Sequence, residues 1–260
     1  MHRRRAVFWP RPRDTPRKTE SQHVIRHDRT YQNLDDDRDA RGAVGLGPAA
    51  ARATTTPYPT MAPLEQYLMP RDAEITLARS AAPASISQDA DVLVLGAHGF
   101  ESAVKGKNGF VCMVMRSWMA PAGDPDFWNP KTRGPACFNA SAARSYLPMV
   151  LKKTDWVEAG MSQERLWESM KAGFAKQEWP AMEPGSMCYM MSAQQYLGDA
   201  GKQWHPHLMF FVPETSAMAW GAGVPGSPVL EGKDPGDHLT IFMIPLGKWS
   251  DGTPVHAGAH

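Results

Sequence analysis

Two patterns of apolar and polar residues alternate along residues 61–260. Short continuous apolar runs bounded by turn residues are typical of strands, and apolar residues spaced by three or four are typical of amphipathic helices. Six runs predict strands: residues 91–95, 100–105, 110–118, 186–192, 207–213 and 239–246. Short links join the first three runs, which favours antiparallel pairing between them.

Three stretches predict helices, at residues 65–82, 141–157 and 162–177. Pro70 suits the first position of a helix, where its missing N–H costs nothing, and Pro148 places the start of the second main helix near residue 148. In the third stretch, Leu166, Met170 and Phe174 recur every four residues and predict a face that packs on the sheet.

The order of strands, helices and strands predicts the fold class α+β, with a mainly antiparallel sheet of about six strands and the helices packed on one face. Residues 61–260 are therefore expected to form a single α+β domain. Long loops are expected at residues 119–140, 193–206 and 213–238, and loops of this length in a compact domain often cover a ligand.

Residues 1–60 have a different composition from the rest of the chain. They hold 11 Arg, one Lys and seven acidic residues, a net charge of +5, and few large apolar residues. Such a segment buries too little surface to offset the entropy of ordering its backbone. We expect either a disordered basic, Pro-rich leader or a mis-assigned N-terminal extension that precedes a true start at Met61.

Charge and hydropathy exclude several classes of protein. The net charge of the whole chain is +1, which gives no general electrostatic reason to expect nucleic acid or an anionic membrane as a partner. No apolar run approaches the roughly 20 residues of a transmembrane helix, and residues 1–60 lack the apolar core of a signal peptide. The cytoplasm is therefore the default location, and export stays open if the N-terminus is mis-assigned.

The clearest chemical pattern is the pair His205 and His207 at the entrance of a predicted strand. Side chains two positions apart on a strand project to the same side, so both imidazoles could reach one metal ion. His238 and Glu214 are candidate further ligands. Zn, Cu and Fe all accept imidazole, so the divalent metal is not specified. Two alternatives remain: the two histidines merely hydrogen-bond the loop backbone, or they act as an acid and a base without a metal.

The spacing of these residues resembles the first metal-binding motif of the cupin family, from Gly198 through the histidine pair and Glu214 to Gly221. The segment 235–238, Pro-Gly-Asp-His, resembles the second motif. The glycine lies one position too far upstream, and Glu214 lies at least two positions too far downstream. The resemblance covers about forty residues and implies a metal held by histidines, whereas its all-β barrel conflicts with the predicted helices.

Methionine and tryptophan are abundant, with 16 and nine residues. Alternation along the strands places methionines on shared faces, and methionine suits permissive apolar binding surfaces. Candidate walls of a pocket for a small-molecule substrate or ligand are Trp118, Trp128, Trp204, Trp220 and Met209.

Two functions follow from these patterns. One is a small-molecule enzyme, a hydrolase or oxidoreductase, whose metal activates water or polarises a substrate oxygen. The alternative is a non-catalytic binding module for an apolar or aromatic ligand. A homo-oligomer formed at a sheet edge is a third interpretation.

The three cysteines do not suggest a disulfide framework. Cys112 and Cys188 lie in apolar strands, and Cys137 lies in a predicted loop. Without a signal peptide, free thiols are the default, although Cys137 could pair with either of the others after export.

Overall fold

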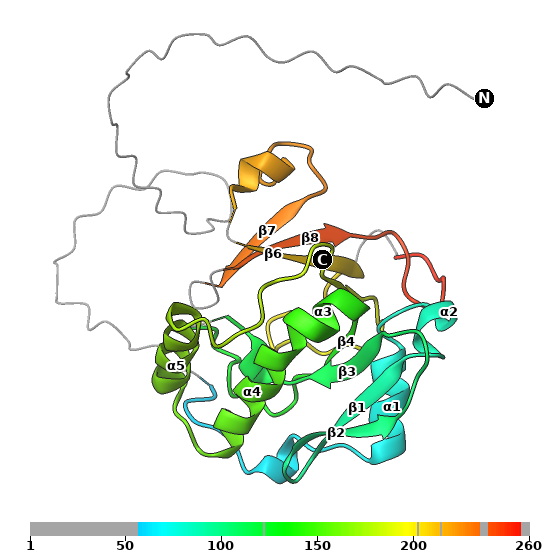
Figure 1. Ribbon diagram of the computed structural model, residues 1–260. Helices are drawn as coiled ribbons and strands as arrows, with labels where there is room; N and C mark the ends of the chain where they lie inside the picture. Colours follow the sequence, from blue (N-terminus) through cyan, green and yellow to red (C-terminus); the bar gives the residue numbers. More distant parts are fainter. Residues whose placement is uncertain (1–56, 122, 202, 214, 235–238, 256–260) are drawn as a thin grey trace, which may run out of the picture. The chain divides into compact units, whose positions relative to one another are not determined.

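The computed structural model describes residues 57–121, 123–201, 203–213, 215–234 and 239–255 (Figure 1). All of them belong to the compact unit Ala53–His260. The strands are β1 Asp91–Gly96, β2 Gly99–Val104, β3 Val111–Met115, β4 Gly134–Phe138, β5 Met187–Met190, β6 His207–Pro213, β7 Leu230–Asp234 and β8 Leu239–Pro245. The α-helices are α1 Arg71–Arg79, α2 Ala84–Ser87, α3 Ala140–Ser145, α4 Leu147–Glu158 and α5 Gln163–Ala175.

The α+β class is confirmed, but the sheet differs from the expected six-stranded antiparallel one. It has eight strands in the order β2-β1-β3-β4-β5-β6-β8-β7, and β2 and β7 are its two edge strands. The sheet is mixed, because β1 pairs with β3 in parallel whereas the other pairs of described strands are antiparallel. This open sheet is not the closed all-β barrel that the cupin resemblance implies.

The two extra strands lie inside segments that the sequence predicts as loops. β4 falls within residues 119–140 and β7 falls within residues 213–238. The start of α4 at Leu147, with proline at its second position, confirms the helix start expected near Pro148. The predicted helix 65–82 is shortened to α1, with Pro70 as its N-cap residue.

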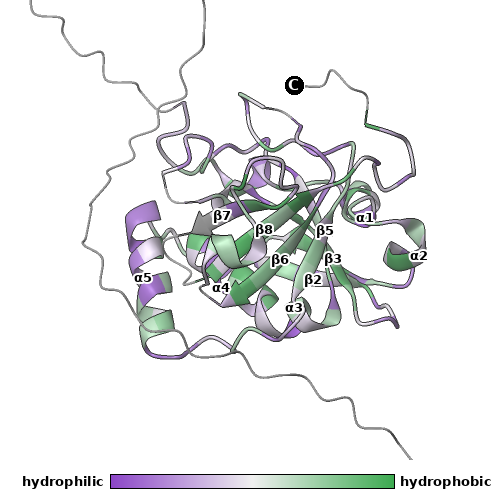
Figure 2. Ribbon diagram, turned by 90° about the horizontal axis from the view of Figure 1, so that it is seen from above, coloured by the Kyte–Doolittle hydropathy of each residue, from purple (hydrophilic) through white to green (hydrophobic). Residues whose placement is uncertain are grey.

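Helices cover both faces of the sheet, so the expectation of helices on one face is wrong. Strand residues alternate between the faces: Cys112 and Val114 of β3 pack with Leu77 and Ala78 of α1, whereas Met113 packs with residues of α3 and α4. In Figure 2 the strands lie between α1 on one side and α3 with α4 on the other. The face under α3, α4 and α5 is called the α4 face below.

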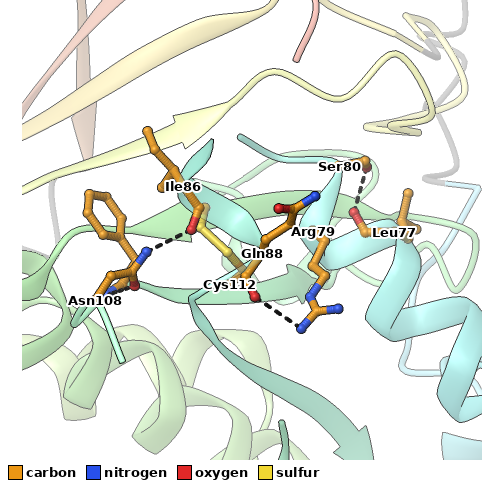
Figure 3. The surroundings of a disulfide bond; sticks show 9 residues. Leu77, Arg79, Ser80, Ile86, Gln88, Asn108 and Cys112 are labelled. Carbon is orange, nitrogen blue, oxygen red and sulfur yellow. Dashed lines mark hydrogen bonds between the residues drawn. A yellow bond between two sulfur atoms is a disulfide. The ribbon is translucent and has the colours of Figure 1, made fainter. Parts of the chain in front are cut away.

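The cysteines also differ from the default expectation. Cys137 lies in β4 opposite Cys112 of β3, and the two form a disulfide under α1 and α2 (Figure 3). Directly opposed positions on neighbouring antiparallel strands bring Cβ atoms close, which allows the bond. Cys188 is a buried free thiol.

Two further expectations concern the N-terminal leader and membrane-spanning helices. The predicted leader, residues 1–60, lies outside the described residues except for its last four, so its boundary with a domain at 61–260 stays a prediction. Among the described residues, no helix has the length and apolar character needed to cross a membrane.

Candidate functional site

The α4 face contains a cavity of about 230 Å³ between the sheet and the helices. We call it the methionine cavity, because six of the twelve residues that line it are methionines. Its lining residues are Met115, Met119, Pro121, Tyr146, Met149, Val150, Lys153, Met170, Met209, Gly232, Ile241 and Met243.

Strand alternation and register build the floor of this cavity. Met209 of β6 lies directly opposite Met243 of β8, so the two side chains share a face. Ile241 pairs with Gly232 of the edge strand β7 on that same face. A Cβ atom at Gly232 would lie 3.3 Å from Met243 Cε, so the glycine makes room for the Met243 side chain at the floor of the cavity.

Helices α4 and α5 form the roof. Met149, Val150 and Lys153 lie on the inward side of α4, at spacings of three and four residues. Met170 comes from α5, whose N-cap is Ser162: its side chain accepts a hydrogen bond from the Arg165 N–H at 3.4 Å. The Tyr146 ring stacks on Phe211 with 3.8 Å between centroids, which fixes the end of the roof next to α3.

Lys153 is the one lining residue with a formal charge. The residue is only 5% exposed, and its Nζ atom lies 4.0 Å from the centroid of the Trp167 ring. Trp167 is one turn before Met170 on α5, so the ammonium group lies where the roof helices meet. A cation placed over an indole face is electrostatically stabilised by the ring.

The predicted ligand-contacting residues do not gather in one place. Met209 lines the methionine cavity. Trp118 is fully buried, and its indole N–H donates to the Thr154 hydroxyl at 3.1 Å. Trp128 lines a separate hollow of about 450 Å³ beside Met161.

The other two predicted tryptophans lie elsewhere on the sheet. Trp204 precedes β6 and packs edge-on against His207, with 4.5 Å between ring centroids. Trp220 stacks on Phe242 of β8 and is 41% exposed. Phe242 neighbours Ile241 and Met243 in the strand and therefore points to the opposite face from the cavity.

Of the two histidines, His207 is buried and held by the backbone of His205. His207 is 2% exposed, and its Nδ1 lies 2.7 Å from the His205 carbonyl oxygen. Since a carbonyl oxygen only accepts, Nδ1 carries the proton and Nε2 keeps its lone pair in the neutral ring. Burial lowers the pKa of His207, and the nearby His205 ring lowers it further, against the hydrogen bond to the His205 carbonyl, which raises it.

The expected metal set is only partly covered by the structure. His238 and Glu214 lie outside the described residues. Within the part of the chain that the structure describes, no three His, Cys, Asp or Glu side chains come together as a metal-binding group. Metal binding by His205, His207, His238 and Glu214 therefore stays a prediction.

Sequence reasoning missed the residues of the roof, above all Lys153. A signal was present, because Lys153 continues the inward spacing of Leu147 and Val150 toward Val157 on α4. A basic residue within an apolar helical stripe is unusual, since charged residues normally occupy the solvent side.

Comparisons of this chain with protein-family models, with curated proteins and with solved structures find no match.

Proposed function

We propose that the protein is a binding module for a small apolar or aromatic ligand that occupies the methionine cavity. The observation that carries this proposal is a cavity of about 230 Å³ lined almost entirely by apolar side chains. Small-molecule sites are concave, mostly apolar hollows with few polar groups, so a hollow of this composition is a candidate ligand site.

The volume limits the size of the ligand. An apolar cavity of about 150 Å³ in another protein binds benzene, which has six non-hydrogen atoms. In proportion, a cavity of about 230 Å³ accommodates roughly nine such atoms. This size fits a chain of about eight carbons or a substituted benzene ring.

The methionine side chains suit such a role. Methionine is unbranched and polarisable, so it changes shape at low cost and contacts aromatic rings favourably. The cavity is therefore expected to accept several related ligands of similar size.

The affinity expected from burial is moderate. Burying about eight CH2 groups at about 0.8 kcal/mol each contributes about 6 kcal/mol, which corresponds to a dissociation constant on the order of 10–100 µM. Isothermal titration of the full chain with octan-1-ol should give saturable binding in this range. Absence of saturable binding up to the solubility limit of the alcohol would contradict the proposal.

A cavity-filling variant tests the location of the ligand. Val150 lines the cavity and Leu151, the next residue on α4, does not. Val150→Phe should weaken octan-1-ol binding at least tenfold by occupying the space, whereas the control Leu151→Phe should bind like the wild type. Thermal unfolding of both variants verifies that each is folded.

A second candidate function is the metal-dependent enzyme predicted from the sequence. The observation that favours it is the hydrogen bond between His207 Nδ1 and the His205 carbonyl oxygen, because metal-ligating histidines usually donate their other ring N–H to such a group. In this proposal His205 and His207, with His238 or Glu214, hold a Zn, Cu or Fe ion that activates water or polarises a substrate oxygen.

Elemental analysis tests this second candidate. Wild-type protein should carry close to one metal ion per chain, and the double variant His205→Gln/His207→Gln should carry almost none. His98→Gln is the matched control, because His98 lies between β1 and β2, far along the chain from the pair. Negligible metal in both wild type and double variant would reject the enzyme.

A further inference from the structure

Lys153 gives the methionine cavity a positive charge, which its other lining residues lack. It lines the cavity together with Met149, Val150 and Met170, and its ammonium group lies over the Trp167 ring. The residue is 5% exposed, so the charge is largely withdrawn from water.

A buried ammonium group loses much of its hydration, and proteins rarely place one against apolar side chains. Lys153 therefore places a cation at the wall of an otherwise apolar cavity, and the Trp167 ring is one partner that stabilises it.

We propose that the ligand of the methionine cavity is an apolar carboxylic acid whose carboxylate pairs with the Lys153 ammonium group. This inference rests on the proposed binding function. The apolar part of the acid lies among the methionines, and the anionic end lies where α4 and α5 meet. In the weakly screened interior, opposite charges attract more strongly than in water.

The indole of Trp167 supports the same position for the carboxylate. Its Nε1 is buried and has no hydrogen-bond acceptor among the described residues. Buried tryptophan N–H groups usually find a partner. A carboxylate brought to Lys153 supplies acceptor oxygens beside this ring.

The cavity volume restricts the apolar part of the acid to roughly nine non-hydrogen atoms. Two kinds of acid have this chemistry, a medium-length aliphatic acid and a short aryl-substituted acid. Octanoate and 3-phenylpropanoate represent them, and each has a neutral alcohol of the same shape, octan-1-ol and 3-phenylpropan-1-ol. Octylamine has the opposite charge.

The test compares these probes on the full wild-type chain by isothermal titration at pH 7.5. A charge-assisted hydrogen bond favours binding by about 10- to 100-fold before the desolvation of the carboxylate is subtracted, so we expect the acid to bind about tenfold more tightly than its alcohol. Octylamine should bind most weakly. The better of the two acids identifies the aliphatic or aryl class.

The variants Lys153→Met and Lys152→Met assign the effect to one charge. Lys152 is the next residue on α4, its side chain is 48% exposed, and it lies 3.9 Å from Asp155. Lys153→Met should lose the preference for the acid and keep the affinity for the alcohol, whereas Lys152→Met should behave like the wild type.

The outcomes separate this inference from the proposed function. If neither acid nor alcohol binds, the proposed function fails. If acid and alcohol bind wild type equally, or if Lys153→Met keeps the preference for the acid, the cavity binds apolar ligands without a carboxylate and the inference is overturned. The wild-type comparison needs no variant to fold.

Discussion

Arg116 and Glu74 form an ion pair whose two side chains are both completely withdrawn from solvent, with Nη2 of Arg116 2.8 Å from Oε1 of Glu74. The same guanidinium donates to the carbonyl oxygens of Tyr67 and Val114. Glu74 Oε1 also accepts from the Leu95 N–H. The pair thus joins α1 to β1 and β3. Burial lowers the pKa of Arg116, and the charge of Glu74 opposes that shift.

We predict that Glu74→Gln lowers the free energy of unfolding by about 3–5 kcal/mol, because it leaves the buried guanidinium without a counter-charge. The exposed pair between Arg71 and Glu101 has the same 2.8 Å separation, so Glu101→Gln is the matched control. Solvent screens the exposed pair, so its loss should change stability little. Urea denaturation measures the free energy of unfolding of both variants. Equal effects of the two substitutions would mean that burial of the first pair has no energetic consequence.

A second prediction concerns the disulfide between Cys112 and Cys137. It closes a loop with a sequence separation of 25 residues, for which restriction of the unfolded chain contributes about 3.5 kcal/mol. The double variant Cys112→Ala/Cys137→Ala should therefore unfold at a lower urea concentration than the oxidised wild type. Adding a reductant should destabilise the wild type and leave the double variant unchanged.

Thiol counting provides the check on this bond. The chain has three cysteines, and Cys188 is the buried free thiol, with a pKa raised by burial. Protein prepared without reductant should show one thiol per chain after unfolding, and three after reduction. Three thiols before reduction would contradict the disulfide.

Local patterns predicted most of the elements and little of their assembly. β1, an apolar run that ends at Gly96, and α5, an apolar stripe that begins after Ser162, are both determined by their local sequence. By contrast, β4 contains Gly134 and Pro135 and lies among turn residues, so it has no strand signal of its own. It forms because β3 and β5 flank it, and pairing between distant segments is not encoded in local periodicity.

The same limit explains the candidate site. Met209 was predicted to contact a ligand because alternation fixes which face a strand residue occupies. The distances between the five predicted wall residues, four tryptophans and Met209, depend on strand order and on which helix covers which face. The sequence alone therefore could not show whether they line one pocket. Lys153 continues the apolar stripe of α4, but the contact of its ammonium group with Trp167 depends on α5 lying opposite α4, which the local sequence does not specify.

A third prediction concerns the pH dependence of stability. Burial raises the pKa of Glu158, the charge of Asp155 adds to the shift, and the Gly99 N–H and His98 oppose it. The folded protein therefore binds this proton more tightly than the unfolded chain, whose value is about 4.3. The contribution of Glu158 to stability falls as pH rises from about 4.3 through the folded pKa, and is lowest above it.

Glu158→Gln removes this titration while keeping the shape of the side chain. The variant should gain stability relative to wild type as pH rises from 4 to 7, and the two should converge near pH 4. Urea denaturation at several pH values measures the difference. Asp155→Asn is the companion variant: it should reduce the pH dependence in part, because Asp155 is the negative charge that adds to the shift. A difference that shrinks as pH rises would contradict the assignment.

The last prediction concerns Asn139, which ties the start of α3 to the neighbouring strand. Its side-chain oxygen accepts from the N–H groups of Ala142 and Met187, and its amide donates to the Gly185 carbonyl at 2.8 Å. Asn139→Ala should cost about 2 kcal/mol, since it removes a helix cap and two further hydrogen bonds. Asn139→Asp keeps both acceptor contacts and loses only the donation, so it should cost about half as much.

Because α3 leads directly into Tyr146 and α4, loss of the Asn139 anchor should also loosen the roof of the methionine cavity. Hydrogen exchange of the α4 amides should therefore be faster in Asn139→Ala than in Asn139→Asp, and equal rates would show that the cap acts on α3 alone.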